Sequence, residues 1–380
     1  MKSESSRTPH LPRTPHTPHT PHTPHMLREI HEQPDALQRA LEMNGVVAQR
    51  IAAAVARRGV QVIVLAGRGT SDHAALYGQY LLQHLTGIPV ALATPSLYTL
   101  FGAPFQLQRA LVIGISQSGE SPDIVEVIAQ SRAAGALTVA VTNRQDSPLA
   151  NAADETLFCA AGAELSVAAT KTYTTTCALL ALLAASLPGG ERLLPHLPRL
   201  PALMRAALAT EETVAGAVVR YVHARDCIVL GRGFQYSTAR ETALKLAETC
   251  YVIAMPFSSA DFRHGPAALV ERGLPVILFA PPGRTAPDSL ALLGWLRERG
   301  ADCTVIGEER HPLEQATTAI ALDLPRLSED TERGGEVQVD ELLAPLPYIV
   351  PGQFFAVYLA LAKGLNPDQP RGLTKVTHTR

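Results

Sequence analysis

The sequence predicts an α/β protein built from two parallel sheets, each covered by helices on both faces. Short apolar runs such as VIVLA (62–66), LVIGI (111–115) and CIVLG (227–231) alternate with segments of helical character. Strands that are apolar at every position are typical of parallel sheets that are buried on both sides. A chain of 380 residues, 46% of them hydrophobic, is long enough for two such domains.

The two halves of the chain repeat one another. The sequence Gly-Arg-Gly follows a strand at 67–69 and again at 231–233. The distance from its last glycine to the loop after a later strand is 47 residues in the first copy, to Ser116, and 48 residues in the second, to Pro281. Matching landmarks at a matching spacing indicate an internal duplication.

The domain boundaries follow from this repeat and from local composition. The TPH repeats near the N-terminus are rich in proline and can form neither a helix nor a core. We expect a disordered low-complexity extension at 1–25, N-terminal helices and the first subdomain at 26–194, a linker at 195–208, the second subdomain at 209–365, and a C-terminal tail at 366–380.

Composition argues against several classes of protein. The net charge of −2 gives no electrostatic reason to expect binding to nucleic acid or to acidic membranes. The longest apolar run, 177–187, is shorter than the roughly 20 residues that span a bilayer, and no signal peptide is evident. The five scattered cysteines are expected to be reduced core residues. We therefore expect a cytoplasmic protein without a metal site or a cofactor.

A hydroxyl-rich loop follows the strand 111–115. Its sequence, SQSGES (116–121), leads into Pro122-Asp123, which is a good helix start. Backbone N–H groups at a helix N-terminus, together with serine hydroxyls, can hold a phosphate without a lysine. The equivalent loop of the second copy is APPGRTAPD (280–288), so the fold itself does not require serines. The alternative is a turn that merely caps the helix. The candidate phosphate ligands are Ser116, Gln117, Ser118 and Ser121, with Thr70 and Ser71 on the preceding loop.

Several motifs occur in order along the chain: GTS (69–71), LVIGISQSGESPD (111–123), LSVAATKTYTTT (165–176), ALKLAETCY (243–251), RHGP (263–266) and DQPRGLTKVT (368–377). Together they resemble the sugar isomerase (SIS) family, and within it the isomerase half of glucosamine-6-phosphate synthase and the glucosamine-6-phosphate deaminases. The resemblance runs from about residue 26 to the C-terminus. It implies two tandem SIS subdomains, each a flavodoxin-like parallel sheet, in a homodimer. It also implies that the C-terminal tail at 366–380 closes the active site.

The resemblance also implies roles for individual residues. It places the phosphate-binding residues at Ser71 and in the 116–121 loop, a catalytic glutamate at Glu248 and its lysine at Lys245. It makes His264 the ring-opening histidine, which reaches the site of a neighbouring subunit, and Lys375 the lysine that meets the open-chain carbonyl. Ala169 stands where a serine is often found, which removes one polar contact.

Chemistry supports these roles but leaves alternatives open. Lys245 and Glu248 lie at i and i+3, so they share a helix face and could equally form a surface ion pair. Beside a phosphate site, Glu248 could move a proton between carbon-1 and carbon-2 of an open-chain sugar while Lys245 offsets charge on the oxygen. His264 could instead be structural, and Lys375 could form a Schiff base or act electrostatically.

Three functions are compatible with these residues. The first is deamination and isomerisation of an amino-sugar phosphate, namely glucosamine-6-phosphate to fructose-6-phosphate and ammonia. The second is synthesis of the aminotransferase type, or a related deglycase or isomerase acting on another sugar phosphate. The third is a non-enzymatic sugar-phosphate sensor. No glutamine amidotransferase domain precedes the matched region in these 380 residues, so we expect glutamine not to be a substrate.

Overall fold

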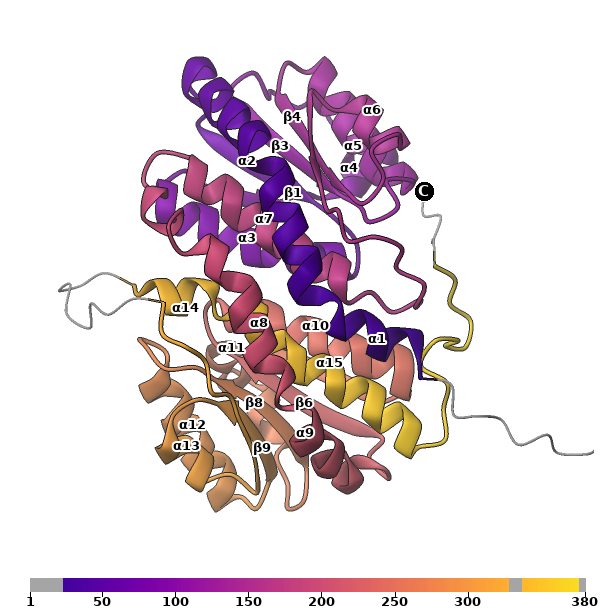
Figure 1. The fold of residues 1–380 in the computed structure, drawn as a ribbon, viewed down its shortest axis with the longest axis vertical. Helices are drawn as coiled ribbons and strands as arrows, with labels where there is room; N and C mark the ends of the chain where they lie inside the picture. Colours follow the sequence, from indigo (N-terminus) through magenta and orange to yellow (C-terminus); the bar gives the residue numbers. More distant parts are fainter. Residues whose placement is uncertain (1–22, 328–336, 376–380) are drawn as a thin grey trace, which may run out of the picture.

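Two lobes, each centred on a five-stranded parallel sheet, form the protein in the computed structural model, which describes residues 23–327 and 337–375 (Figure 1). The elements of the first lobe and its entry helices are α1 (His25–His31), α2 (Gln33–Arg58), β1 (Val62–Ala66), α3 (Thr70–Thr86), β2 (Val90–Leu92), α4 (Pro95–Thr99), β3 (Ala110–Ile115), α5 (Pro122–Ala133), β4 (Leu137–Thr142), α6 (Pro148–Ala152), β5 (Glu155–Phe158) and α7 (Lys171–Ser186).

A helical connection leads to the second lobe. It consists of η1 (Glu191–Leu193), η2 (Leu197–Arg199), α8 (Leu200–Leu208), α9 (Glu211–Ala217) and η3 (Val218–Tyr221). The second lobe contains β6 (Asp226–Gly231), α10 (Gln235–Cys250), β7 (Ile253–Ser258), α11 (Ser259–Arg263), η4 (Pro266–Leu269), β8 (Pro275–Ala280), α12 (Ala286–Glu298), β9 (Asp302–Gly307), α13 (Arg310–Glu314), β10 (Thr318–Ala321), α14 (Val339–Leu343) and α15 (Pro345–Ala362).

The two sheets have the same connectivity. The first has the strand order β2-β1-β3-β4-β5, and the second has β7-β6-β8-β9-β10 when it is read from its β7 edge. This is the flavodoxin-like order, in which the chain reverses direction across the sheet between the first and third strands. The predicted fold class, two tandem α/β subdomains with parallel sheets, is confirmed.

The Gly-Arg-Gly repeat has the same geometry in both lobes. A Cβ atom on Gly67 would lie 2.7 Å from the carbonyl carbon of Ser71, and one on Gly231 would lie 2.2 Å from the carbonyl oxygen of Gln235. The last glycine of each repeat has a positive φ, 53° at Gly69 and 59° at Gly233. In each lobe, glycine lets the following helix begin directly against the end of the first strand.

Alternate residues of β3 face opposite sides of the first sheet. Leu111, Ile113 and Ile115 belong to the core shared with α2, α3 and α7. Ala110 and Val112 belong to the core beneath α4 and α5 on the other face. Gly114 lies on that second face, where a Cβ would come within 2.6 Å of Ile128 on α5. The glycine in LVIGI therefore sets the close approach of α5 to the strand, and with it the position of the serine loop.

One hydrophobic core joins the two lobes. It contains buried residues of α2, α3 and α7 from the first lobe and of α10 and α15 from the second. Figure 1 shows α8, α10 and α15 between the two sheets. By length and composition, the helical stretch Val339–Ala362 could cross a membrane, but 94% of its most apolar window is buried inside the protein. Such burial is typical of the core helix of a globular domain.

All five cysteines are free and buried, as the sequence predicts. Burial raises the pKa of each thiol. The groups of histidine, cysteine and acidic side chains in the described part of the chain form no cluster suited to a metal ion. Of the predicted extension at 1–25, residues 1–22 lie outside the described residues, whereas His25 begins α1.

Candidate active site

The candidate site begins at the point where the first sheet reverses direction. Ala66 of β1 pairs with Gly114 of β3, so these strands end side by side. The sequence places Thr70 and Ser71 on a loop, but they form the first turn of α3, which follows β1 directly, and the loop after β3 carries the serines. Ligands of open α/β sheets bind at such an edge, beyond the carboxyl ends of the strands. The fold thus places two of the predicted polar segments next to each other.

The serine loop is held by hydrogen bonds among its own members. The Ser116 and Ser121 hydroxyls lie 3.0 Å apart, and the Ser116 oxygen accepts a hydrogen bond from the Gly119 N–H at 3.2 Å. The Ser118 hydroxyl accepts the N–H of Glu120 at 3.2 Å. Ser121 is the N-cap residue of α5, but its hydroxyl makes no capping bond. Helix capping alone therefore does not explain this hydroxyl.

Gly119 fixes the shape of the loop. Its φ is +65°, and a Cβ at this position would lie 2.1 Å from the hydroxyl of Ser147. A side chain would therefore be both strained and obstructed. Gln117 contributes through its backbone, because its carbonyl accepts the N–H of Asn143 at 3.0 Å.

Both arginines beside the loop are paired with carboxylates. Arg68 donates to Asp123 at 2.7 Å, and Asp123 is only 1% exposed. Arg144 forms an ion pair with Glu120. The groups that remain for an anion are hydroxyls and backbone N–H groups. The phosphate cradle without a lysine stays a prediction that these groups are able to fulfil.

A buried cluster of charged side chains lies between the lobes and contacts Thr70 at the start of α3. Lys245 on α10 forms ion pairs with Glu248 at 2.6 Å and with Glu241 at 3.3 Å. The lysine also donates to the hydroxyl of Thr70 at 3.1 Å. Its side chain is 1% exposed, that of Glu241 is fully buried and that of Glu248 is 21% exposed. The surface ion pair considered from the sequence is therefore excluded, and Glu248 is the member of the cluster that solvent reaches.

Glu241 anchors the lysine and joins the two lobes. Its carboxylate accepts hydrogen bonds from Thr70 at 3.0 Å and contacts the His73 ring at 2.8 Å, both on α3. Burial acts to raise the pKa of Glu241, but Lys245 and these α3 partners outweigh it, so the pKa is lowered. Burial likewise acts to lower the pKa of Lys245, but the two carboxylates reverse this and raise it. Lys245 is therefore a fixed cation and not a proton carrier.

The sequence reasoning overlooked Glu241. Its signal was present, since Glu241 and Glu248 flank Lys245 at i−4 and i+3 on one face of the helix. A lysine bracketed by two carboxylates is more readily buried than one with a single partner.

The lowered pKa of Glu241 predicts acid sensitivity. A carboxyl group with a depressed folded-state pKa stabilises the protein above its ordinary pKa, here 4.5, and loses that contribution as pH falls through the folded-state value. We expect the free energy of unfolding, from urea titrations at pH 7, 5 and 3.5, to fall on the acid side. Glu241→Gln should show a shallower fall over the same range. An equal pH dependence in the variant would contradict this assignment.

His264 and Lys375 lie apart from the Lys245 cluster. His264 is exposed at the C-terminal end of α11, and among the described residues the structure shows no hydrogen bond or ion pair between its ring and another predicted site residue. Lys375 instead contacts Glu164, at 3.0 Å, and the carbonyl of Ser166, at 2.6 Å. The chain thus brings together Thr70, Lys245 and Glu248, and separately the serine loop, but not all ten predicted residues.

The equivalent loop of the second lobe is occupied by a carboxylate from the same chain. Glu341 on α14 accepts the N–H of Arg284 at 3.2 Å. A Cβ on Gly283 would lie 2.7 Å from the same carboxylate oxygen, so the carboxylate packs directly against this loop. Burial raises the pKa of Glu341. The two loops therefore differ in sequence, and the second one also has the Glu341 carboxylate packed against it.

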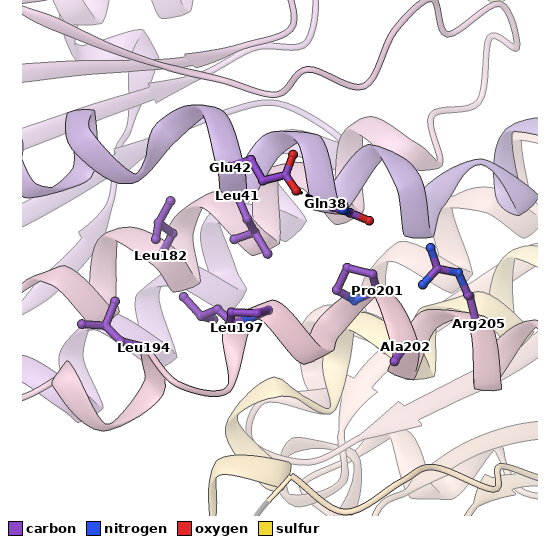
Figure 2. Close-up of a pocket in the computed structure, with 10 residues that line it drawn as sticks. Gln38, Leu41, Glu42, Leu182, Leu194, Leu197, Pro201, Ala202 and Arg205 are labelled. Carbon is purple, nitrogen blue, oxygen red and sulfur yellow. Dashed lines mark hydrogen bonds between the residues drawn. The ribbon is translucent and has the colours of Figure 1, made fainter.

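A separate groove lies between α2, α7 and the 194–205 segment (Figure 2). Its volume is about 400 Å³, and its walls include Leu41, Leu182, Leu197 and Pro201. Figure 2 shows Gln38 and Glu42, joined by a hydrogen bond of 2.9 Å, at its edge. None of the predicted site residues lines this groove, so it is distinct from the candidate site.

Two flavodoxin-like lobes, with a hydroxyl loop at one switch point and a buried lysine–carboxylate cluster between them, define a duplicated α/β protein. The chain belongs to the SIS domain family, whose model matches residues 58–186 and 221–329. The two matched segments contain the two sheets, which confirms the family resemblance seen in the motifs.

The chain is similar in sequence to isomerizing aminotransferases. The chain is 37% identical over 355 residues to the glutamine–fructose-6-phosphate aminotransferase (isomerizing) of Pyrococcus horikoshii, in a match that covers 92% of this chain and 57% of that protein. The chain thus spans a little over half the length of this relative.

Solved structures share the fold over nearly the whole chain. A proposed phosphosugar isomerase from Silicibacter pomeroyi DSS-3 matches with a TM-score of 0.78 and 34% identity, covering 91% of this chain and 100% of that one. Glucosamine-6-phosphate deaminase from Thermotoga maritima matches with a TM-score of 0.72 and 20% identity, covering 93% of this chain and 100% of that one. The second likeness concerns the fold alone.

Proposed function

We propose that the protein is a sugar-phosphate isomerase that converts glucosamine-6-phosphate and water to fructose-6-phosphate and ammonia. The observation that carries the proposal is the Lys245–Glu248 pair at 2.6 Å, whose lysine donates to Thr70 at the start of α3, next to the serine loop. This arrangement supplies a carboxylate for proton transfer and a fixed cation next to a suitable phosphate cradle. The identity to an isomerizing aminotransferase supports the same class of substrate.

The proposed chemistry needs one proton transfer within the sugar. The serine loop holds the phosphate, which orients the open-chain aldehyde end. Glu248 removes the proton on carbon-2, and an enolamine forms. Lys245 offsets the negative charge that develops on its carbon-1 oxygen. Return of the proton to carbon-1, together with transfer of a proton from the nitrogen to the carbon-1 oxygen, gives the imine at carbon-2. Water hydrolyses this imine to the ketone and ammonia.

A homodimer completes the proposal. His264 is exposed in the single chain, so its proposed role in ring opening requires a second subunit to carry it to the site. Lys375 is proposed to meet the carbonyl region of the open-chain sugar. The reaction calls on no metal and no cofactor, and we place the protein in the cytoplasm.

The test is release of ammonia from glucosamine-6-phosphate by the purified chain, without glutamine. We expect ammonia and fructose-6-phosphate in equal amounts. Tight binding of glucosamine-6-phosphate without turnover would replace the proposal with a sugar-phosphate sensor.

A second candidate function is amino transfer to fructose-6-phosphate, favoured by the 37% identity to the aminotransferase. Fructose-6-phosphate with glutamine distinguishes it from the first. Under the proposed function no glutamate forms, whereas glutamate at a rate comparable with ammonia-dependent turnover would favour the aminotransferase.

The serine loop gives a prediction about binding. Replacing Ser116 and Ser118 by alanine removes two hydroxyls that we assign to the phosphate. Binding of fructose-6-phosphate should weaken by about 2–4 kcal/mol, from roughly 1–2 kcal/mol for each charge-assisted hydrogen bond. Calorimetry measures this directly. Ser186→Ala is the control, because that hydroxyl bonds only within α7, to the carbonyl of Leu182. Unchanged affinity in the double variant would remove the loop from the site.

A further inference from the structure

A fully buried carboxylate holds the last described residue of the C-terminal tail. Glu164 lies in the connection between β5 and α7, and its side chain has no exposed surface. The ammonium of Lys375 lies 3.0 Å from its Oε2 atom and donates to the carbonyl of Ser166 at 2.6 Å. The lysine side chain is 27% exposed. Glu164 and Ser166 therefore form a socket for one ammonium group.

The socket is built by the start of α7. Oε1 of Glu164 accepts the N–H groups of Thr170 and Thr172, each at 3.0 Å. Oε2 accepts the hydroxyl of Thr172 at 2.7 Å. Burial acts to raise the pKa of Glu164, but Lys375 and the Thr172 and Thr170 bonds outweigh it, so the pKa is lowered. Its charge is fixed at neutral pH, and the carboxylate is oriented by bonds that do not involve the tail.

Asn143 connects this socket to the serine loop. Its N–H donates to the Gln117 carbonyl at 3.0 Å. Its side chain donates to the carbonyl of Gly162 at 2.8 Å and accepts the N–H of Ala161 at 3.0 Å. Asn143 therefore links the serine loop to the segment that carries Glu164 through hydrogen bonds on both sides. The socket lies at the same sheet edge, because β3, β4 and β5 are parallel neighbours.

Two further polar groups in the socket segment have no partner among the described residues. The Ser166 and Thr170 hydroxyls are fully buried and make no hydrogen bond there. Buried hydroxyls normally have partners. These two belong to residues whose backbone groups bind Lys375 and Glu164.

We propose that Glu164 is the positioning residue of the C-terminal tail, which it docks beside the serine loop by holding the ammonium of Lys375. Upstream, the tail is fixed by Asp368, which accepts the N–H groups of His25 and Met26, and by Arg371, which lies over the ring of Tyr251 at 3.7 Å. The ion pair between Lys375 and Glu164 fixes the end of the tail that lies toward the candidate site. That docking of the tail promotes turnover of glucosamine-6-phosphate rests on the proposed function. The docking of the tail by Glu164 does not depend on that function.

The test is hydrogen exchange of the tail, followed by mass spectrometry on the full-length chain. Glu164→Gln keeps the size of the side chain and one acceptor but loses the charge. We expect exchange of the 371–375 amides to rise about tenfold or more in this variant and in Lys375→Met. The double variant should exchange no faster than the faster single variant, because both remove one interaction. Additive effects would show that the two residues act separately and would overturn the proposal.

Glu29→Gln is the matched control. Glu29 is another buried carboxylate that binds the same segment, through the N–H groups of Leu165 and Ser166, but it does not contact Lys375. Its removal should leave tail exchange unchanged. If Glu29→Gln frees the tail as much as Glu164→Gln does, Glu164 has only a general structural role and the proposal is wrong.

Kinetics separates docking from the proposed reaction. With glucosamine-6-phosphate, Glu164→Gln should lower kcat/KM, and Lys375→Met should lower it at least as far, because it also removes the proposed contact with the sugar carbonyl. The double variant should fall no further than Lys375→Met alone. Binding of inorganic phosphate, measured by calorimetry, should be unchanged, since the serine loop is intact. If wild-type protein releases no ammonia, the proposed function fails while the exchange data still decide whether Glu164 docks the tail.

Discussion

Glu248→Gln should lower turnover of glucosamine-6-phosphate by about 10²–10⁴-fold, which is the usual contribution of a side chain positioned for proton transfer. Glu248 is the only carboxylate paired with Lys245 that is partly exposed, at 21%, while Glu241 is enclosed. Glutamine preserves the shape of the side chain but cannot take the proton. Substrate affinity should change far less than the rate, because the serine loop is untouched.

Exchange of the substrate's carbon-2 proton with deuterated water, followed by NMR, tests this role directly. Wild-type protein should exchange that proton and Glu248→Gln should not. His264→Ala provides the contrast, since it should still exchange the proton when open-chain substrate is supplied. Exchange in Glu248→Gln as fast as in wild type would show that another group is the base.

The fold was predictable because its signals are local and repeated. Apolar strands, Gly-Arg-Gly turns and a matching spacing of 47 and 48 residues identify two parallel sheets from the chain alone. The sequence does not show why Gly114 interrupts an otherwise branched apolar strand. The structure gives the reason, because a Cβ there would lie 2.6 Å from Ile128.

The site was predictable where residues neighbour one another along the chain or on adjacent strands. The serine loop and the Lys245–Glu248 pair are of this kind. The bond between Thr70 and Lys245 is not, because it joins residues 175 positions apart across the two lobes. Glu164 was missed for the same reason. Its partner Lys375 lies 211 positions away, and nothing local marks a glutamate in a loop as buried.

The contrast between the two loops is visible in the sequence, but the packing of the second loop is not. The prolines of APPGRTAPD showed only that the fold itself does not require serines at this position. The structure adds that Glu341, from the helix after the undescribed 328–336 segment, contacts that loop. A carboxylate would repel a phosphate at this position, so the asymmetry between the lobes has an electrostatic as well as a steric basis.

Lys245→Met should lower the free energy of unfolding by about 3–5 kcal/mol, because it removes the cation from a buried cluster and leaves an uncompensated charge. Glu241 has no exposed surface, so water cannot replace the lost ammonium. Urea titration at pH 7 measures the loss. Adding Glu241→Gln to Lys245→Met should restore part of the stability, because the orphaned charge is then removed as well.

Lys171→Met is the matched control for this prediction. Lys171 is also buried, at 2%, and pairs with Glu32 at 2.5 Å, but the Glu32 side chain is 54% exposed. When Lys171 is lost, water can solvate its partner, so the loss of stability should be clearly smaller than for Lys245. Equal losses in the two variants, or no recovery from Glu241→Gln, would mean that lysine packing, and not the buried carboxylate, determines the cost. The cluster would then position Lys245, but its charges would not stabilise the contact between the two lobes as its geometry suggests.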